Sequence, residues 1–457
     1  MSDGHAKSEL GSPPNHGQNL PPRFHLFDGS AGYGVLVVDG SRVHRLSESV
    51  ADLLTFAVSN GRPEIVDQVF DAVGFSRDLV VGAEAPVAIP VRAFSLAIAQ
   101  KCNLGCTYCY ADGGDFGGKP SLMADDVATA AIHRLFDGVL PGEALKLAFL
   151  GGEPLTNRAG LRRATELATE LATARDINIG FSLTTNGTLL TAQDAEFLAR
   201  YRFTVTVSLD GVGATHDKLR PYKGGHGSFE RIVARLAPLL ARQDQIDLAA
   251  RVTVTPRNLS LVDTLNGLVA LGFRSVGFSP MLSSPTGREE MSRDELSTML
   301  DQLIACGRSF EESVRAGRHH AFSNLATALR ELHRGTHRPY PCGAGAGYLG
   351  VSAEGNLSAC HRFVNEPVGA FGDLASGVDR KKQETWLAER HVDRQEPCRS
   401  CWARYLCGGG CHHEVIHRGR PACDYIRDWL TYCLGAYLRL ADDCPWWFAG
   451  EPPSIRS

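Results

Sequence analysis

The chain has 457 residues, a length that predicts about three domains rather than one core. A formal net charge of −4 gives no polycationic face for a phosphate backbone, so nucleic acid is not expected as a partner. No apolar run reaches the ~18 residues of a membrane span, and residues 1–22 are polar and lack the apolar stretch of a secretion signal. We therefore expect a cytoplasmic protein with no membrane partner and a disordered tail over residues 1–22.

Residues 23–83 have the pattern of a small α/β unit. Ser47 is a favourable N-cap residue for a helix that follows two short β-rich runs. The expected elements are strands at 34–38 and 43–46 and helices at 47–56 and 63–73. A linker over residues 83–90 then leads into the next domain.

Strand and helix signals alternate between residues 91 and 290. This alternation is the pattern of a parallel sheet built from βα units. The expected strands are 91–98, 146–150, 178–184, 204–209, 247–254 and 275–280, and the expected helices are 124–140, 158–175, 192–201, 228–243 and 260–272. Six repeats fall short of the eight of a TIM barrel, so the predicted fold class is α/β with a partial (β/α)6 barrel. Residues 291–339 are expected to form a helical bridge to a cysteine-rich C-terminal domain at 340–450.

The thirteen cysteines are many for a cytoplasmic chain, in which disulfides are rare. Three lie from Cys102 to Cys109, Cys306 stands alone on an expected helix, and nine lie from Cys342 to Cys444. Such clustering favours metal sites over disulfides. Cys306 is interpreted as a buried structural thiol.

Cys102, Cys106 and Cys109 directly follow the first expected barrel strand, at the edge where barrel enzymes keep their active sites. Three thiolates can hold three corners of a 4Fe-4S cube and leave the fourth iron for a small molecule. A zinc site is the alternative, although zinc usually takes paired Cys-x2-Cys units.

The spacing Cys-x3-Cys-x2-Cys, with Tyr108 before the third cysteine, resembles the signature of the radical S-adenosylmethionine (SAM) superfamily. The resemblance implies that SAM chelates the open iron, and that the reduced cluster cleaves SAM to a 5′-deoxyadenosyl radical that removes a hydrogen atom from the substrate. It also implies a reductant such as flavodoxin or ferredoxin as a partner.

Further motifs at expected strand ends resemble the SAM contacts of this family. Gly151-Gly152-Glu153 follows the second strand and resembles the motif that binds the SAM amino group, with Glu153 pairing with the ammonium. A tight turn with a solvated Glu is the alternative.

Three more SAM contacts are implied by the resemblance. Asn186 and Ser208 end the third and fourth strands, where ordinary turn chemistry is the alternative. Arg251 on the fifth strand is implied as a partner of the SAM carboxylate, and an arginine satisfied by barrel carboxylates is the alternative. His216-Asp217 and Arg220-Pro221-Tyr222 receive no role and are interpreted as solvated loop residues.

The cysteines beyond residue 340 resemble the SPASM domain, which holds two auxiliary 4Fe-4S clusters. Two fully ligated clusters need eight thiolates, and nine are available. The resemblance implies that the first is held by Cys342, Cys360 and Cys411 and the second by Cys398, Cys401, Cys407 and Cys423. Three 4Fe-4S clusters are therefore expected in all, with a pair of structural zinc sites as the alternative for this domain.

The fourth site of the first auxiliary cluster is either open or filled by another residue. The last ligand of the second cluster departs from the family pattern, because Cys423 falls earlier than that ligand usually does and Cys433 lies too far along the chain. Cys423 is chosen over Cys433 as the last ligand because it follows Pro421 and directly precedes an expected helix at 424–441. Cys433 and Cys444 are interpreted as helix-packing cysteines, and His412-His413-Glu414 as a polar surface turn, with a metal site as the alternative.

The SPASM resemblance implies a peptide or small protein as the substrate. Residues 23–83 resemble the winged-helix element that captures a leader peptide by strand addition, with a plain extension packed on the barrel as the alternative. The segments 360–364 and 407–414 are similar to the maturation proteins of quinohemoprotein amine dehydrogenase, which join cysteine sulfur to methylene carbons. Thioether formation is the reaction that this similarity implies.

Other reactions stay open. Anaerobic sulfatase-maturing enzymes form formylglycine, but a carboxylate directly follows one of their auxiliary-cluster cysteines, where this chain has His361 or Arg362. Carbon–carbon crosslinking maturases of ribosomally made peptides are another alternative. An electron-transfer or scaffold protein belongs to a different class, and the open iron predicted at Cys102–Cys109 argues against it because a pure carrier gains nothing from open coordination.

Overall fold

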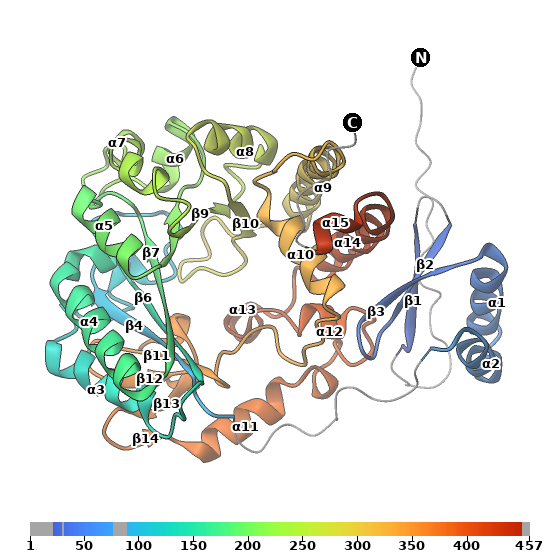
Figure 1. Ribbon diagram of the computed structural model, residues 1–457, viewed down its shortest axis with the longest axis horizontal. Coiled ribbons are helices and arrows are strands. Elements are labelled where there is room, and N and C mark those ends of the chain that lie inside the picture. The colour runs from blue at the N-terminus through green and yellow to red at the C-terminus, as the bar shows by residue number, and fades with distance from the viewer. Residues whose placement is uncertain (1–21, 30–31, 76–88, 450–457) are drawn as a thin grey trace.

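The computed structural model describes residues 22–29, 32–75 and 89–449. Most of the expected tail and of the expected linker lies outside these ranges. Figure 1 places the barrel on the left, the cysteine-rich segment at the bottom and centre, and the N-terminal unit on the right. Within the described residues, no helix is both long and apolar enough to cross a membrane.

Six parallel strands form the barrel sheet, and their spatial order follows their order in the chain. They are β4 (Ala93–Gln100), β6 (Ala144–Gly151), β7 (Asn178–Thr185), β8 (Thr204–Ser208), β9 (Asp247–Val254) and β10 (Val276–Pro280). The helices between them are α3 (Asp125–Phe136), α4 (Arg158–Arg175), α5 (Ala192–Arg200), α6 (Ala214–Leu219), α7 (Phe229–Leu240) and α8 (Leu261–Ala270). The predicted α/β partial barrel is confirmed.

Burial alternates along the barrel strands, which separates the two faces of the sheet. On β9, Leu248, Ala250, Val252 and Val254 are buried in the main core beneath the helices, whereas Arg251 is accessible. Because successive side chains of a strand point to opposite faces, Arg251 faces the barrel interior. Ser208 on β8 lies in register with Arg251, so both belong to this inner face.

The cysteine-rich segment continues the barrel sheet instead of forming a separate layer. β11 (Tyr348–Val351) pairs in parallel with β4, and β12 (Asn356–Ser358), β13 (Ala370–Asp373) and β14 (Gly377–Val378) follow it in antiparallel order. The short β5 (Ser121–Leu122) also pairs with β4. This pairing places Cys342 and Cys360, which flank β11 and β12, beside the strand that leads to Cys102.

The expected helical bridge consists of two helices, α9 (Arg293–Arg315) and α10 (Ser323–His333). Cys306 is buried on α9, as predicted. The remaining helices of the C-terminal part are α11 (Arg380–Arg390), α12 (Arg404–Cys407), α13 (His412–Arg418), α14 (Cys423–Asp443) and α15 (Pro445–Ala449), with 3-10 turns η3 (His361–Phe363), η4 (Pro367–Gly369) and η5 (Val392–Arg394). Two further 3-10 turns in the barrel are η1 (Asp112–Gly114) and η2 (Pro154–Asn157).

Glu311 connects α9 to α14 through a buried ionic contact. Its carboxylate accepts hydrogen bonds from Arg439 at 2.7 and 2.8 Å and from the Tyr432 hydroxyl at 2.8 Å. Burial alone raises the pKa of Glu311, but these hydrogen bonds and the charge of Arg439 outweigh it and hold the pKa below its ordinary value. The charged carboxylate is therefore the form that stabilises this helix pair.

The Glu311→Gln substitution is expected to lower the free energy of unfolding by about 3 kcal/mol at neutral pH, because it leaves Arg439 without its charged partner. Since the folded-state pKa is depressed, this contribution is complete above the ordinary pKa of 4.5 and is lost as the pH falls through the folded-state value. Urea unfolding at pH 7 and pH 4 should show the difference from the parent chain shrinking at the lower pH. The matched control is Glu312→Gln, which changes an exposed neighbour and should alter stability by under ~0.5 kcal/mol. A pH-independent difference would contradict the ionic explanation.

The N-terminal unit is a three-stranded antiparallel sheet followed by two helices. Its elements are β1 (Phe24–Asp28), β2 (Tyr33–Val37), β3 (Arg42–Leu46), α1 (Glu48–Ser59) and α2 (Pro63–Val73). Ser47 caps α1 as predicted, and β1 is an additional strand. The unit docks on the cysteine-rich part rather than on the barrel, because Arg45 donates to the Leu438 carbonyl at 3.0 Å and His25 stacks on Trp402 at 3.7 Å between ring centroids.

Candidate active site

Cys102, Cys106 and Cys109 lie in the loop that follows β4, with all three side chains partly accessible. Burial raises the pKa of Cys106 to about 12, Arg220 opposes this rise, and the nearby thiols of Cys109 and Cys102 add to it. Thiolates at Cys102 and Cys109 would therefore repel a thiolate at Cys106. A cationic metal cluster relieves this repulsion, so the donor set fits the predicted iron–sulfur cluster.

Gly151 and Gly152 let the end of β6 approach the cysteine loop. A Cβ atom on Gly152 would lie 2.3 Å from the Lys101 carbonyl oxygen and 2.9 Å from the Cys102 amide nitrogen. A Cβ on Gly151 would lie 2.3 Å from the Ala99 carbonyl oxygen, and the φ of Gly151 is +142°. Both glycines are thus required because the backbone that leads to Cys102 passes too close for a side chain at either position.

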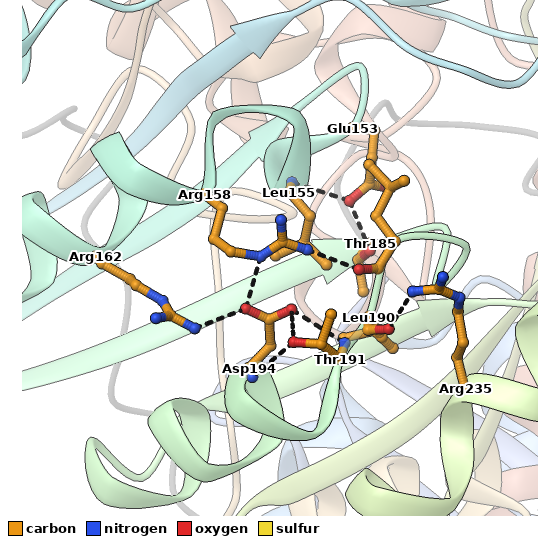
Figure 2. Close-up of polar contacts among 10 residues, drawn as sticks. Glu153, Leu155, Arg158, Arg162, Thr185, Leu190, Thr191, Asp194 and Arg235 are labelled. Atoms are coloured by element: carbon orange, nitrogen blue, oxygen red, sulfur yellow. Dashed lines mark hydrogen bonds and ion pairs between the residues drawn. The ribbon is translucent and has the colours of Figure 1, made fainter.

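Glu153 is fully buried and joins the ends of β6 and β7, as Figure 2 shows. Its carboxylate accepts hydrogen bonds from the Leu155 amide at 3.0 Å, the Thr185 hydroxyl at 2.7 Å and the Asn186 amide at 2.7 Å. Three of its four or so acceptor positions are therefore occupied by the protein. The alternative of a solvated Glu is wrong, and one acceptor position is not used by these three contacts.

The helices behind this edge are fastened by Asp194, which is also drawn in Figure 2. Asp194 closes a capping box with Thr191 at the start of α5. The same carboxylate accepts from Arg158 at 2.8 Å and Arg162 at 3.0 Å, both on α4. This contact holds the loop after β7 against the start of α4 and so supports Glu153.

Asn186 contacts the cysteine loop directly. Its side-chain amide donates to Asn103 at 2.9 Å and approaches the Cys102 sulfur at 3.7 Å, while its carbonyl oxygen accepts from the Thr188 amide and hydroxyl. Asn186 is therefore an anchor for the loop that carries the three cysteines. These contacts are separate from the contact with SAM that the resemblance predicts for Asn186.

Ser208 and Arg251 lie side by side on the inner face of β8 and β9. Arg251 donates to the Ser279 hydroxyl of β10 at 2.5 Å. The surrounding protein of the barrel interior partly desolvates Arg251 and lowers its pKa although the side chain is accessible, and the nearby Tyr425 and Glu414 oppose this effect. Among the described residues no carboxylate forms an ion pair with Arg251, so its charge is available to an anionic group inside the barrel.

The interpretation of His216 and Arg220 as solvated loop residues is wrong. Arg220 is largely buried, donates to the Tyr108 hydroxyl at 2.5 Å and lies 3.6 Å from the buried Asp210 carboxylate. Asp210 also accepts from the Tyr108 hydroxyl and from the Thr253 amide. An ionic network thus lies directly behind the cysteine loop, next to the aromatic residue of the signature.

The backbone on either side of Arg220 supports the cysteine loop as well. The Gly105 amide donates to the Pro221 carbonyl at 2.8 Å, and the Thr107 amide donates to the Leu219 carbonyl at 3.0 Å. His216 is buried, and burial together with Arg220 lowers its pKa to about 3, so it is neutral near pH 7. Sequence spacing carried no signal for this network because it depends on burial against Tyr108 and Asp210.

The Arg220→Gln substitution is expected to lower the free energy of unfolding by about 3 kcal/mol, because Asp210 then becomes an uncompensated buried charge. The additional change Asp210→Asn should restore part of this loss, since it removes the orphaned charge. Denaturant unfolding of both variants measures the effect. The matched control is Arg163→Gln, whose exposed ion pair with Asp125 should contribute under ~1 kcal/mol. An equal loss in R220Q and R163Q would contradict the proposed network.

The C-terminal cysteines form two further groups. Cys342, Cys360 and Cys411 interact electrostatically: burial raises the pKa of Cys360 to about 12, and Cys411 and Cys342 add to the rise. Arg362, two residues after Cys360, lies with Nη1 3.7 Å from the Cys411 sulfur. This is the set that the sequence assigns to the first auxiliary cluster.

The second group lines one cavity. Burial raises the pKa of Cys398 to about 11, Arg420 opposes this rise, and the nearby thiols of Cys407, Cys401 and Cys423 add to it. All four cysteines line the same cavity, whereas Cys433 is buried on α14. The structure thus brings Cys423 to this set and leaves Cys433 out of it. Cys444 is buried at the C-cap of α14.

Tyr110 and His361 bridge the first two cysteine groups. Their rings lie 5.7 Å apart, and the Tyr348 hydroxyl of β11 is 2.9 Å from His361 Nδ1. Burial raises the pKa of Tyr110, and both Cys109 and Cys360 add to the rise. Arg362 lies over the Tyr110 ring at 5.6 Å and pairs with Glu414 at 2.7 Å. Polar side chains therefore fill the region between the two groups.

Comparison with known proteins supports this assignment of the barrel. Residues 96–243 match the family model of the radical SAM superfamily. The chain is 26% identical over 365 residues to a serine-type anaerobic sulfatase-maturating enzyme of Klebsiella aerogenes, which covers 77% of this chain and 87% of the relative. It is 22% identical over 361 residues to the radical SAM cyclopropyl synthase TigE of Paramaledivibacter caminithermalis, covering 74% and 72%.

Two solved structures have the same fold. One is anSMEcpe with bound AdoMet, with a TM-score of 0.64 and 20% identity over 77% of this chain and 100% of that chain. The other is Streptococcus suis SuiB bound to its precursor peptide SuiA, with a TM-score of 0.51 and 15% identity over 87% and 96%. At these identities the likeness establishes the fold alone.

Proposed function

Because this chain belongs to the radical SAM superfamily, we propose that it is a maturase that forms thioether crosslinks in a ribosomally made peptide or a small enzyme subunit. A SAM molecule and a 4Fe-4S cluster held by Cys102, Cys106 and Cys109 would supply a 5′-deoxyadenosyl radical for removal of a hydrogen atom from substrate carbon. The observation that carries the proposal is the group of Cys342, Cys360 and Cys411, which Tyr110 and His361 connect to the cysteine loop of the barrel. Three protein thiols would leave one iron of a cluster free for a substrate thiolate.

The residues of this chain have distinct parts in the proposal. Cys102, Cys106 and Cys109 hold the SAM-binding cluster, and Asn186 fixes their loop. The inner-face pair Ser208 and Arg251 is proposed to bind the polar part of SAM, with Arg251 facing its carboxylate. Glu153 uses its remaining acceptor position for the SAM ammonium.

Two auxiliary clusters are proposed in the C-terminal part. The first is held by the group of Cys342, Cys360 and Cys411, and the second by Cys398, Cys401, Cys407 and Cys423. A reductant such as flavodoxin or ferredoxin would deliver the electron. The electrostatic influence of Cys342 and Cys411 on Cys360 supports the first assignment, and the cavity that the other four cysteines line supports the second.

The N-terminal unit is proposed to hold a leader segment of the substrate. Its sheet has the order β1-β2-β3, so the outer edge of β3 has no strand partner among the described residues. An extended peptide can add to such an edge through main-chain hydrogen bonds. The SuiB structure, which shares the fold, contains a bound precursor peptide, and this supports a peptide as the class of substrate.

Formylglycine formation is the second candidate, favoured by the similarity to the Klebsiella relative. The residue after Cys360 is His361, so a carboxylate does not directly follow this cysteine. Arg362 nevertheless holds the Glu414 carboxylate at 2.7 Å, which brings a carboxylate to this region from α13. Thioether formation consumes the substrate thiol, whereas formation of formylglycine from serine leaves it free. A thiol reagent can therefore distinguish the two reactions.

The test uses the anaerobically reconstituted enzyme with SAM, dithionite and a cysteine-containing peptide encoded beside the gene. Release of 5′-deoxyadenosine is expected, with a peptide lighter by two hydrogens that no longer reacts with a thiol reagent. A peptide that keeps its thiol and reacts with a hydrazide would indicate a serine-derived formylglycine instead. Unchanged SAM would overturn the enzymatic proposal.

A further inference from the structure

Glu366, His413 and His417 converge outside the three cysteine groups. His413 and His417 lie one turn apart on α13, and Glu366 lies at the N-cap of η4. Nε2 of His413 is 3.1 Å from Oε1 of Glu366, and Nε2 of His417 is 2.9 Å from Oε2 of the same carboxylate. One ligand atom from each residue lies within 4.8 Å of the others.

Two imidazoles and one carboxylate are the donor set of zinc sites that keep an open position for water. Ligand atoms bound to tetrahedral zinc at about 2.0–2.1 Å lie roughly 3.3 Å from one another. The observed separations of 2.9 and 3.1 Å are close to this value, and the two imidazole rings lie 4.4 Å apart. Small side-chain rotations would therefore place all three donors around one ion.

The charges near Glu366 also fit a divalent cation. Within the described residues its ion-pair partners are the two histidines, and it forms no ion pair with an arginine or lysine. Arg362 is the arginine nearest in sequence, and it pairs instead with Glu414 at 2.7 Å. A divalent cation would therefore balance the negative charge of the Glu366 carboxylate.

Access to the site comes from the solvent side. The His417 side chain is 41% exposed and that of Glu366 is 32% exposed, whereas His413 is nearly buried. An ion can enter past His417, and water can complete its coordination. The interpretation of His412-His413-Glu414 as a polar surface turn is wrong, because these residues lie on α13 and both histidines are buried.

The three residues lie next to two cysteines of the first auxiliary group. Cys411 is the N-cap residue of α13, the helix that carries His413 and His417. Glu366 is connected to Cys360 by two backbone hydrogen bonds. The Glu366 amide donates to the Phe363 carbonyl at 3.0 Å, and the Phe363 amide donates to the Cys360 carbonyl at 3.0 Å. An ion at this point joins the two segments that carry Cys360 and Cys411.

We propose that Glu366, His413 and His417 bind one zinc ion, which fixes the distance between the segments that carry Cys360 and Cys411. The site is separate from the cysteines and from the inner face of the barrel. Its occupancy is therefore measurable without reference to SAM cleavage.

The experiment uses the full chain with its iron–sulfur clusters loaded. The protein is incubated anaerobically with zinc sulfate and desalted, and zinc and iron are counted together by mass spectrometry. The parent chain should retain one zinc, and His417→Ala should weaken zinc binding by about 100-fold, since loss of even an outer partner of a zinc ligand costs ~10–100-fold. His417 is the exposed member, so this variant is the least able to disturb folding. Glu366→Gln should weaken binding as well.

The matched control is His133→Ala, which removes an exposed histidine on the barrel helix α3 and should leave zinc binding unchanged. X-ray absorption at the zinc edge should show nitrogen and oxygen neighbours at about 2.0–2.1 Å, without sulfur at ~2.3 Å. Absence of zinc from the parent chain, zinc retained at equal affinity in H417A, or sulfur neighbours at the zinc would each overturn the proposal. Equal iron content in all variants confirms that the clusters are intact.

Discussion

Replacing Cys102, Cys106 and Cys109 together by serine is expected to reduce SAM cleavage to the background level. Serine cannot supply the thiolates that hold a 4Fe-4S cluster, and a cluster of this type carries the electron that cleaves SAM. With three clusters proposed, the iron content should fall by roughly a third, from about 12 to about 8 per chain. Iron analysis and chromatography for 5′-deoxyadenosine measure the two effects together.

Cys306→Ala is the matched control, because Cys306 is buried on α9 and lies outside the three cysteine groups. It should keep both the iron content and SAM cleavage. If the triple serine variant kept its full iron content and still released 5′-deoxyadenosine, the cluster assignment would be wrong.

The second large effect is expected from Gly152→Ala. The new methyl group would lie 2.3 Å from the Lys101 carbonyl oxygen and 2.9 Å from the Cys102 amide, both of which are backbone atoms that cannot rotate away. The loop must therefore move by a large fraction of an ångström. A displacement of about 1 Å at a reacting centre lowers the rate ~100-fold, and we expect this loss in SAM cleavage.

Gly180→Ala is the matched control on the neighbouring strand β7. Its Cβ would meet nothing closer than the Leu145 carbonyl oxygen at 3.9 Å, so SAM cleavage should be unchanged. Cleavage by G152A at the parental rate, with the fold intact by circular dichroism, would show that the close approach of β6 to the cysteine loop is not required.

The barrel could be predicted from the sequence because each of its elements has a local signal. The predicted helix at 158–175 and the strand at 247–254 match α4 and β9 in both bounds, since each is long and strongly periodic. The spacing of Cys102, Cys106 and Cys109 predicted the position of the candidate site because it too is a local pattern in the sequence. Neighbouring thiols on one loop are visible without knowledge of the fold.

The remaining features depend on partners far away in the chain. β11 has four residues and no periodic pattern, and it exists because β4 offers a free edge. The buried role of Arg220 depends on Asp210 and Tyr108, and the convergence of His417 with Glu366 spans 51 residues of sequence. None of these contacts leaves a trace in local composition, so the sequence predicted neither β11 nor the meeting of His417 with Glu366, and it favoured a solvated loop at Arg220.

The parallel pairing of β11 with β4 limits how this protein can be divided. A truncation before residue 340 would not release an intact barrel, because β4 is buried at seven of its eight positions and would be left with one bare hydrogen-bonding edge. Unpaired apolar edges of this kind promote aggregation. The barrel and the cysteine-rich part are therefore expected to express as one soluble unit and to unfold in a single transition.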